Sequence, residues 1–154
     1  MSIEFRIANQ KDCDLMFNWA NDPETRKNAF NTSHIEYSEH ILWFSQLNLN
    51  NVLIYFDKLN VPVGVVRFDN KSNEWVITIM VDSRQRNKGY ASKMLSTSPI
   101  EFFKQNPLAD KITAYIKESN TASIRAFSKV GFVLESTVLI GKFSCYKMTL
   151  SRNG

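Results

Sequence analysis

The spacing of apolar and polar positions predicts four strands in the first half of the chain. Apolar residues alternate with polar ones from Ile3 to Ala8, which is the period of a short strand. Three apolar runs follow, over Val52–Phe56, Val61–Phe68 and Trp75–Val81. Because only short, turn-rich segments separate these three runs, we expect them to form an antiparallel meander.

A helical period lies between the first two predicted strands. Asn9 is suited to cap a helix, with Asp12 at the third position. The apolar stripe of this helix consists of Leu15, Met16 and Trp19. The run Asn21–Pro23 then breaks the helix, because proline lacks the N–H that a helix interior needs.

A second helix is predicted before the strand Val52–Phe56. Residues 22–36 are polar and mixed, and they predict a loop with a helical turn. Ser38 is placed to cap the helix that follows. Its core stripe consists of Ile41, Phe44 and Leu47.

The second half of the chain alternates helices and strands. A helix is predicted from Gly89 to Gln105, and Pro99 would kink or restart it. The later elements are a strand, a helix ended by Gly131, and a hairpin: Asp110–Lys117, Thr121–Val130, Phe132–Leu139 and Phe143–Leu150. This order predicts an α/β fold, with a mixed, mostly antiparallel central sheet of about seven strands flanked by about four helices.

Composition limits the size and the setting of the fold. The chain has 154 residues, 44% of them hydrophobic, which fits one globular domain over residues 1–154. Its two cysteines, Cys13 and Cys145, lie far apart, so neither a disulfide framework nor a metal site is expected. No signal peptide is evident and no apolar run is long enough to cross a membrane, so we expect a cytoplasmic protein without a membrane partner.

The net charge of +4 favours an anionic partner. The chain has neither a basic helix nor an aromatic RNA-binding motif, which argues against nucleic acid. Positive charge instead gathers at Arg84, Arg86 and Lys88, between a predicted strand and a predicted helix. A helix start offers free N–H groups, and Gly89 lets the backbone approach a ligand closely, so this turn suits a phosphate. The alternative is a solvated loop before an ordinary helix start.

Two motifs in this half resemble a known family. The run Arg86-Asn87-Lys88-Gly89-Tyr90-Ala91 is similar to the Arg/Gln-x-x-Gly-x-Gly/Ala pyrophosphate loop of the GNAT superfamily of acyl-CoA N-acyltransferases. The run from Asn120 through Phe127, Lys129 and Gly131 to Phe132 resembles its second signature, Asn-x-x-Ala-x-x-x-Tyr-x-Lys-x-Gly-Phe. Further upstream, Phe17–Lys27 and Ile35–Phe44 are similar to the branch that acetylates the 4-amino group of nucleotide-linked amino sugars. Related patterns occur in ribosomal-protein N-terminal acetyltransferases.

The resemblance implies acetyl-CoA as a co-substrate, a primary amine as acceptor, and a sheet that is splayed in the middle. The backbone of the splayed strand would pair with the pantetheine arm, and an N–H near Met80 or Val81 would face the thioester oxygen. Such a donor stabilises the developing oxyanion, an effect of about 3–4 kcal/mol in other acyl transfers. The residues implied in cofactor binding are Ile79, Met80, Val81, Arg86, Asn87, Lys88, Gly89, Tyr90, Ala91, Asn120 and Phe127. Asn120 has a second reading as the cap of the helix that follows it.

The residues for proton transfer depart from the family pattern. The position where many members carry a glutamate is Val76 here, so Glu74 on the same strand face and His40 are the candidate bases. A structural or substrate-contacting role for His40 stays open. The usual tyrosine, whose hydroxyl protonates the leaving thiolate, is replaced by Phe127. Water or another hydroxyl would then have to protonate the sulfur.

The acceptor is assigned to the N-terminal half by the same resemblance. Trp43 could stack on a base or sugar, and Arg26 could pair with a diphosphate. Lys27 is interpreted as an exposed, solvated side chain. The other candidates for acceptor contacts are Asn21, Asp22, Tyr37, Glu39 and His40. A protein N-terminal acetyltransferase, a non-catalytic acyl-CoA-binding module and a homodimer remain open alternatives.

Overall fold

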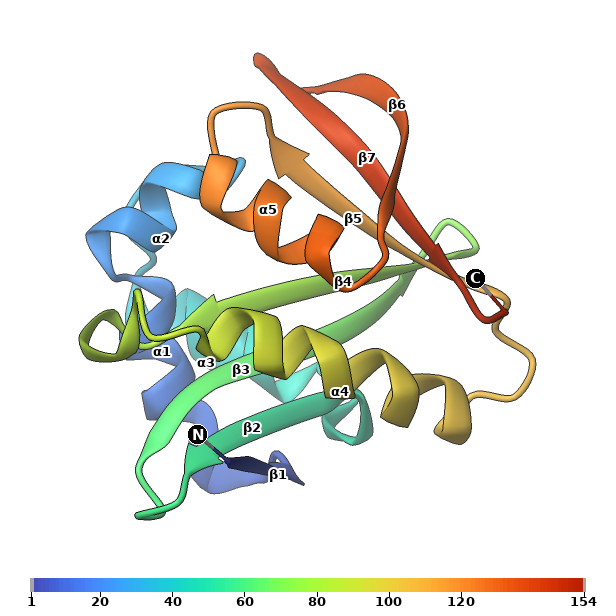
Figure 1. Cartoon of the computed structure of the whole chain (residues 1–154). Coiled ribbons are helices and arrows are strands. Elements are labelled where there is room, and N and C mark those ends of the chain that lie inside the picture. Colours follow the sequence, from blue (N-terminus) through green and yellow to red (C-terminus); the bar gives the residue numbers. More distant parts are fainter. Residues whose placement is uncertain (1, 154) are drawn as a thin grey trace. The chain divides into compact units, whose positions relative to one another are not determined.

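The computed structural model describes residues 2–153, and its strands follow the sheet order β1-β2-β3-β4-β5-β7-β6 (Figure 1). The strands are β1 Ile3–Ile7, β2 Val52–Asp57, β3 Pro62–Lys71, β4 Glu74–Val81, β5 Lys111–Lys117, β6 Val133–Ile140 and β7 Phe143–Ser151. The α-helices are α1 Cys13–Ala20, α2 Pro23–Asn28, α3 Tyr37–Ser45, α4 Tyr90–Gln105 and α5 Thr121–Lys129. The predicted α/β class is confirmed, with α2 as an additional helix where we expected a helical turn.

The sheet is mostly antiparallel, with one parallel pair around a crossover helix. β1 and β2 are antiparallel, as are β5 with β7 and β6 with β7. β4 and β5 are parallel, with Val76 opposite Thr113, because α4 carries the chain back between them. A β-bulge lies between Leu134 and Ser136 of β6.

The described residues fall into two compact units. The first holds the residues up to Val66 together with Ile79–Tyr90, and the second holds Arg67–Thr78 together with the residues from Ala91 onward. The first unit is built on a buried cluster from its helices and strands: Ala8, Met16, Trp19, Phe44, Val52, Ile54 and Val65. Trp19 is only 5% exposed, which confirms its assignment to the core.

A short 3-10 helix, Gln10–Asp12, leads directly into α1 and carries the cap at Asn9 that the sequence predicts. The Asn9 side chain accepts a hydrogen bond from the Lys11 amide, and the Asn9 amide donates to the Asp12 carboxylate at 2.8 Å. These reciprocal bonds form a capping box that satisfies free N–H groups at the helix start. Arg6 of β1 pairs with the same carboxylate at 2.7 Å, so the cap also ties the helix to the strand.

Helix α3 differs from its prediction in two respects. It begins at Tyr37 with Glu36 as the N-cap residue, so the prediction of a Ser38 cap is wrong. Ile41 is 44% exposed while His40 is 2% exposed, so the inward stripe contains His40 and not Ile41. The imidazole fills the inward position because its nitrogen is hydrogen-bonded to the Cys13 carbonyl there, which offsets the cost of burying a polar group.

The second unit packs α4 against aromatic side chains of the strands. Phe102 of α4 stacks on Phe68 of β3 with ring centroids 4.4 Å apart and meets the edge of Trp75 of β4 at 4.9 Å. Helix α4 runs unbroken through Pro99, so the prediction of a restart there is wrong. Beyond its C-terminal end, the Arg152 guanidinium donates to the backbone carbonyls of Phe103, Asn106 and Ala109. Arg152 thus bonds the Phe103 carbonyl in the last turn of α4 and two carbonyls of the segment that follows the helix.

Candidate active site

The turn between β4 and α4 has a backbone suited to an anion. After β4 ends at Val81, a short 3-10 helix covers Ser83–Gln85, and α4 begins at Tyr90. Asn87 and Gly89 have positive φ angles of 62° and 82°, with Lys88 between them. Such left-handed residues turn neighbouring N–H groups toward a common side, where an anion can accept from them. A Cβ added at Gly89 would meet no atom within 4 Å, so the space beside this residue is open.

The arginines of this turn are paired with carboxylates of the first unit. Arg84 lies 3.1 Å from Asp82, and Arg86 lies 2.6 Å from Asp22 and 3.1 Å from Glu24. Lys88, whose side chain donates to the Gln85 amide oxygen at 3.2 Å, forms no ion pair among those found in the described residues. The expected concentration of positive charge is therefore largely offset, and the backbone N–H groups are the main attraction for an anion here.

Asp82 fixes the start of the turn. Its buried carboxylate accepts from the Trp19 indole N–H at 2.8 Å and from the Arg84 amide at 2.8 Å. The Arg84 side chain, followed by the Trp19 indole, lowers the pKa of Asp82 to about 2 against the opposing effect of burial. The carboxylate thus stays ionised and holds the turn to α1 across the whole neutral range.

The residues implied in cofactor binding divide between the two units. Ile79, Met80 and Val81 are half-buried in the first unit, where Met80 packs against the buried cluster. In the same unit, Asn87, Lys88 and Gly89 are exposed, Arg86 is half-buried and Tyr90 is buried. Ala91, Asn120 and Phe127 belong to the second unit. Two continuous segments of these residues, Ile79–Val81 and Arg86–Tyr90, therefore lie in one unit.

Asn120 precedes α5 as its N-cap residue, and Phe127 lies within this helix. The Asn120 side chain accepts from the Ser123 amide at 3.3 Å, so its alternative reading as a helix cap is confirmed. Phe127 is 3% exposed and packs edge-on against Phe132, with ring centroids 5.0 Å apart. Its ring offers no proton to a leaving thiolate.

Glu74 is held in a network across the strands of the second unit. The Tyr115 hydroxyl donates to its carboxylate at 2.6 Å, and Lys147 lies 3.0 Å from the other carboxylate oxygen. Lys147 also pairs with Glu135 at 2.9 Å. The hydrogen bond from Tyr115, followed by that from Lys147, holds the pKa of Glu74 below its usual range. These contacts make Glu74 a weak proton acceptor.

His40 is enclosed by the packing of α1 and α3. Its Nε2 lies 2.8 Å from the Cys13 carbonyl oxygen, and because a carbonyl only accepts, this nitrogen carries the proton and donates. The imidazole packs against Phe17 and Trp43 at centroid distances of 5.2 and 5.3 Å. This geometry favours the structural reading of His40.

The residues expected to contact the acceptor mostly stabilise the segment after α1. The Asn21 side chain donates to the Ile35 carbonyl at 2.9 Å and accepts from the Ile35 amide at 2.8 Å. Arg26 donates to backbone carbonyls of Ala20, Asn31 and Ser33. Trp43, in contrast, keeps 37% of its surface exposed. Tyr37 keeps 45% of its surface exposed, so these two aromatic side chains offer surface to an acceptor.

Sequence reasoning missed the partners that hold these groups. Tyr115 and Lys147 sit opposite each other on β5 and β7, a register that the spacing along one strand does not reveal. Asp82 carried a local signal, since an aspartate two residues before Arg84 can accept from its backbone amide.

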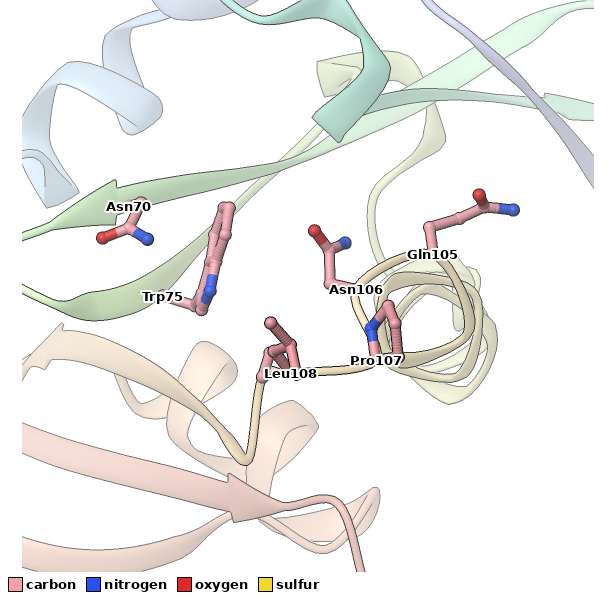
Figure 2. Close-up of a pocket in the computed structure, with 7 residues that line it drawn as sticks. Asn70, Trp75, Gln105, Asn106, Pro107 and Leu108 are labelled. Carbon is pink, nitrogen blue, oxygen red and sulfur yellow. The ribbon is translucent and has the colours of Figure 1, made fainter.

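One shallow pocket lies at the other end of α4. It is lined by Asn70, Trp75, Gln105, Asn106, Pro107, Leu108 and Ala109, and Figure 2 shows Trp75, Asn106 and Leu108 around its open space. None of the predicted site residues lines it. Within residues 2–153, no three His, Cys, Asp or Glu side chains come together as metal ligands. No helix in that same stretch combines the length and the apolar character that a membrane crossing requires.

Comparison with known proteins identifies the family. Residues 3–133 match the acetyltransferase (GNAT) domain. The chain therefore belongs to the GNAT acetyltransferase family, and it is an acetyl-CoA-dependent N-acetyltransferase. None of the curated proteins compared with the chain matches it.

Solved structures share the fold at low sequence identity. A GNAT-family acetyltransferase from Bacillus anthracis is 19% identical, with a TM-score of 0.84 over 100% of this chain and 97% of that chain. A spermidine N-acetyltransferase from Vibrio cholerae, in complex with CoA and spermine, is 15% identical, with a TM-score of 0.82 over 98% and 96%. The aminoglycoside acetyltransferase AAC(6')-Ib, in complex with coenzyme A, is 19% identical, with a TM-score of 0.80 over 99% and 96%.

Proposed function

We propose that this chain is a single-domain, cytoplasmic enzyme that acetylates the 4-amino group of a nucleotide-linked amino sugar, by direct attack in a ternary complex. The proposal that the chain binds acetyl-CoA at this site rests on the turn at Asn87 and Gly89, whose positive φ angles open the backbone beside the start of α4. The acceptor half is supported by the likeness of Phe17–Lys27 and Ile35–Phe44 to the amino-sugar branch, and by the exposed indole of Trp43.

The turn before α4 is the proposed holder of the CoA pyrophosphate. Free N–H groups at the start of a helix and its positive dipole end both favour an anion. The backbone of Ile79–Val81 would pair with the pantetheine arm, and an N–H near Met80 or Val81 would donate to the thioester oxygen as negative charge develops there.

The proposed reaction needs a neutral amine. Its nitrogen attacks the thioester carbon, the new C–N bond forms, and the C–S bond breaks as the nitrogen loses one proton. Because Glu74 is held ionised by Tyr115 and Lys147, and because His40 is enclosed, we assign the amine proton to solvent. Phe127 has no proton to give, so water also protonates the departing thiolate.

A panel of acceptors tests the substrate. The purified chain is mixed with acetyl-CoA and, in separate reactions, with a UDP-linked 4-amino sugar, the free amino sugar, spermidine, kanamycin or a peptide with a free N-terminus. Release of free thiol is followed with a chromogenic disulfide. We expect the UDP-linked sugar to give the highest kcat/KM. A higher value for the peptide would favour a protein N-terminal acetyltransferase, and CoA binding with no thiol release on any amine would favour a binding module.

A further inference from the structure

The carboxylate of Asp22 joins the turn before α4 to the start of α2. Its Oδ2 accepts from Arg86 Nη2 at 2.6 Å and from the Thr25 amide at 3.2 Å. Asp22 is the N-cap residue of α2, so one oxygen atom both caps this helix and holds the turn. All of these residues belong to the first unit.

Arg86 makes further contacts with the first turn of α2. Its Nη2 also lies 3.2 Å from the Thr25 hydroxyl, and its Nη1 lies 3.1 Å from the Glu24 carboxylate. The side chains of Arg86 and Asp22 are 25% and 18% exposed, whereas that of Glu24 is 62% exposed. Because solvent screens an exposed pair more strongly, the pair with Asp22 is the stronger hold on Arg86.

The positions of these contacts along the turn explain their effect. Asp82 at its start is bound to Trp19, and Arg86, directly before Asn87, is bound to Asp22. Two anchors therefore precede the N–H groups of Asn87–Tyr90: one attaches the turn to the end of α1, and the other attaches it to the start of α2. Ordering a flexible turn opposes binding, and a turn ordered in advance avoids that cost.

We infer that Asp22 is a positioning residue for acetyl-CoA: it holds Arg86 so that the amides of Asn87–Tyr90 are already arranged for the pyrophosphate. This inference rests on the proposed role of the turn in cofactor binding. Arg86 then supports cofactor binding by attaching the turn to α2, and not by placing its charge on the phosphate. The opposite arrangement, in which Arg86 leaves Asp22 to bind the pyrophosphate, makes the carboxylate a competitor of the cofactor.

The substitution Asp22→Asn distinguishes these two arrangements, because they predict opposite changes in CoA affinity. Asparagine caps a helix as well as aspartate does, so α2 keeps its cap while the ion pair with Arg86 is lost. Isothermal titration with CoA should show a Kd about fivefold or more above that of the wild type. The kcat at saturating acetyl-CoA should stay within about twofold of the wild-type value. The substitution should therefore appear as a raised KM for acetyl-CoA. An unchanged or tighter CoA affinity in this variant would overturn the inference.

Matched variants control for indirect effects. Glu24→Gln removes the more exposed partner and should change the CoA affinity less than Asp22→Asn does. Asp57→Asn, in the turn after β2, should leave the affinity unchanged. The double variant Arg86→Gln, Asp22→Asn should bind CoA no more weakly than the single variant with the lower CoA affinity, because the two residues act through one contact. Additive losses in the double variant would contradict the inference.

The wild type separates failure of this inference from failure of the proposed function. A wild-type protein that binds no CoA would overturn the role of the turn itself. A wild type that binds CoA and a variant that binds it equally well would overturn the positioning role of Asp22 alone. Should Asp22→Asn not fold, Asp22→Ser gives the same test, because serine is also a favourable helix cap and also removes the carboxylate. We then expect the same rise in Kd.

Discussion

The indole N–H of Trp19 donates a 2.8 Å hydrogen bond to the carboxylate of Asp82, across 63 positions of the chain. Both groups are buried, and the bond joins the end of α1 to the segment that leaves β4. Trp19 therefore has two roles, since its ring fills the core of the first unit while its nitrogen fixes the turn before α4.

Replacing Asp82 by Asn should make stability depend on pH in a defined way. Because the pKa of Asp82 is lowered to about 2, its charge stabilises the fold fully above a pH of about 4 and progressively less as the pH falls toward 2. We expect Asp82→Asn to lower the free energy of unfolding by about 1–2 kcal/mol at pH 7. Urea unfolding of both proteins at pH 7, 4 and 2.5 measures this, and a deficit as large at pH 2.5 as at pH 7 would contradict it.

Replacing Gly89 by Ala should weaken CoA binding more than it weakens the fold. The positive φ of Gly89 makes alanine strained there by about 1–2 kcal/mol, and its Cβ would point into open space where the phosphate is expected. Gly141, in the turn between β6 and β7, has a φ of 58° and also no atom near a Cβ, so Gly141→Ala is a matched control. We expect both variants to lose similar stability and only Gly89→Ala to lose CoA affinity, by about tenfold or more. Equal CoA affinities of the Gly89→Ala and Gly141→Ala variants would argue against the turn as the phosphate site.

Replacing Glu74 by Gln tests whether this carboxylate is the base. Since Tyr115 and Lys147 keep the pKa of Glu74 low, we expect the kcat of Glu74→Gln to stay within about fivefold of the wild type at pH 8. The variant should lose stability, because Lys147 would be left with Glu135 as its remaining carboxylate partner among these pairs. A drop in kcat of about a hundredfold or more, with a changed pH–rate profile, would assign the base to Glu74 after all.

Adding a hydroxyl at Phe127 tests how the thiolate leaves. A thiol has a pKa of about 8.5, so its anion is a tolerable leaving group at neutral pH without an acid. We therefore expect the kcat of Phe127→Tyr to change by less than about threefold. Pre-steady-state thiol release is the measurement. An increase of tenfold or more would show that protonation of the sulfur limits the wild type.

Features set by neighbours in the chain were predictable from the sequence. The cap formed by Asn9 and Asp12 and the left-handed residue Gly131 after α5 depend on residues a few positions apart, and both are observed. The seven strands followed from apolar runs in the same way. The start of α3 was misplaced because Ser38 is a favourable cap by type, and the helix begins before it.

Features set by contacts between distant segments were not predictable. The pair of Asp22 and Arg86 spans 64 positions, and no local pattern says which carboxylate an arginine will meet. The same holds for Tyr115 and Glu74, which meet because β4 and β5 are neighbours in the sheet. The charge at the turn was therefore predicted correctly by residue type, while its neutralisation by Asp22, Glu24 and Asp82 became visible only in the fold.

The pairing of Arg84 and Arg86 with carboxylates has a consequence for ionic strength. A site that attracts an anion through free positive side chains weakens steeply as salt screens those charges. In this turn the arginine charges are already offset, and fixed N–H groups at a helix start supply the attraction. The affinity for a small phosphorylated ligand should thus vary little between dilute buffer and concentrated salt, whereas a long polyanion would gain little from this surface.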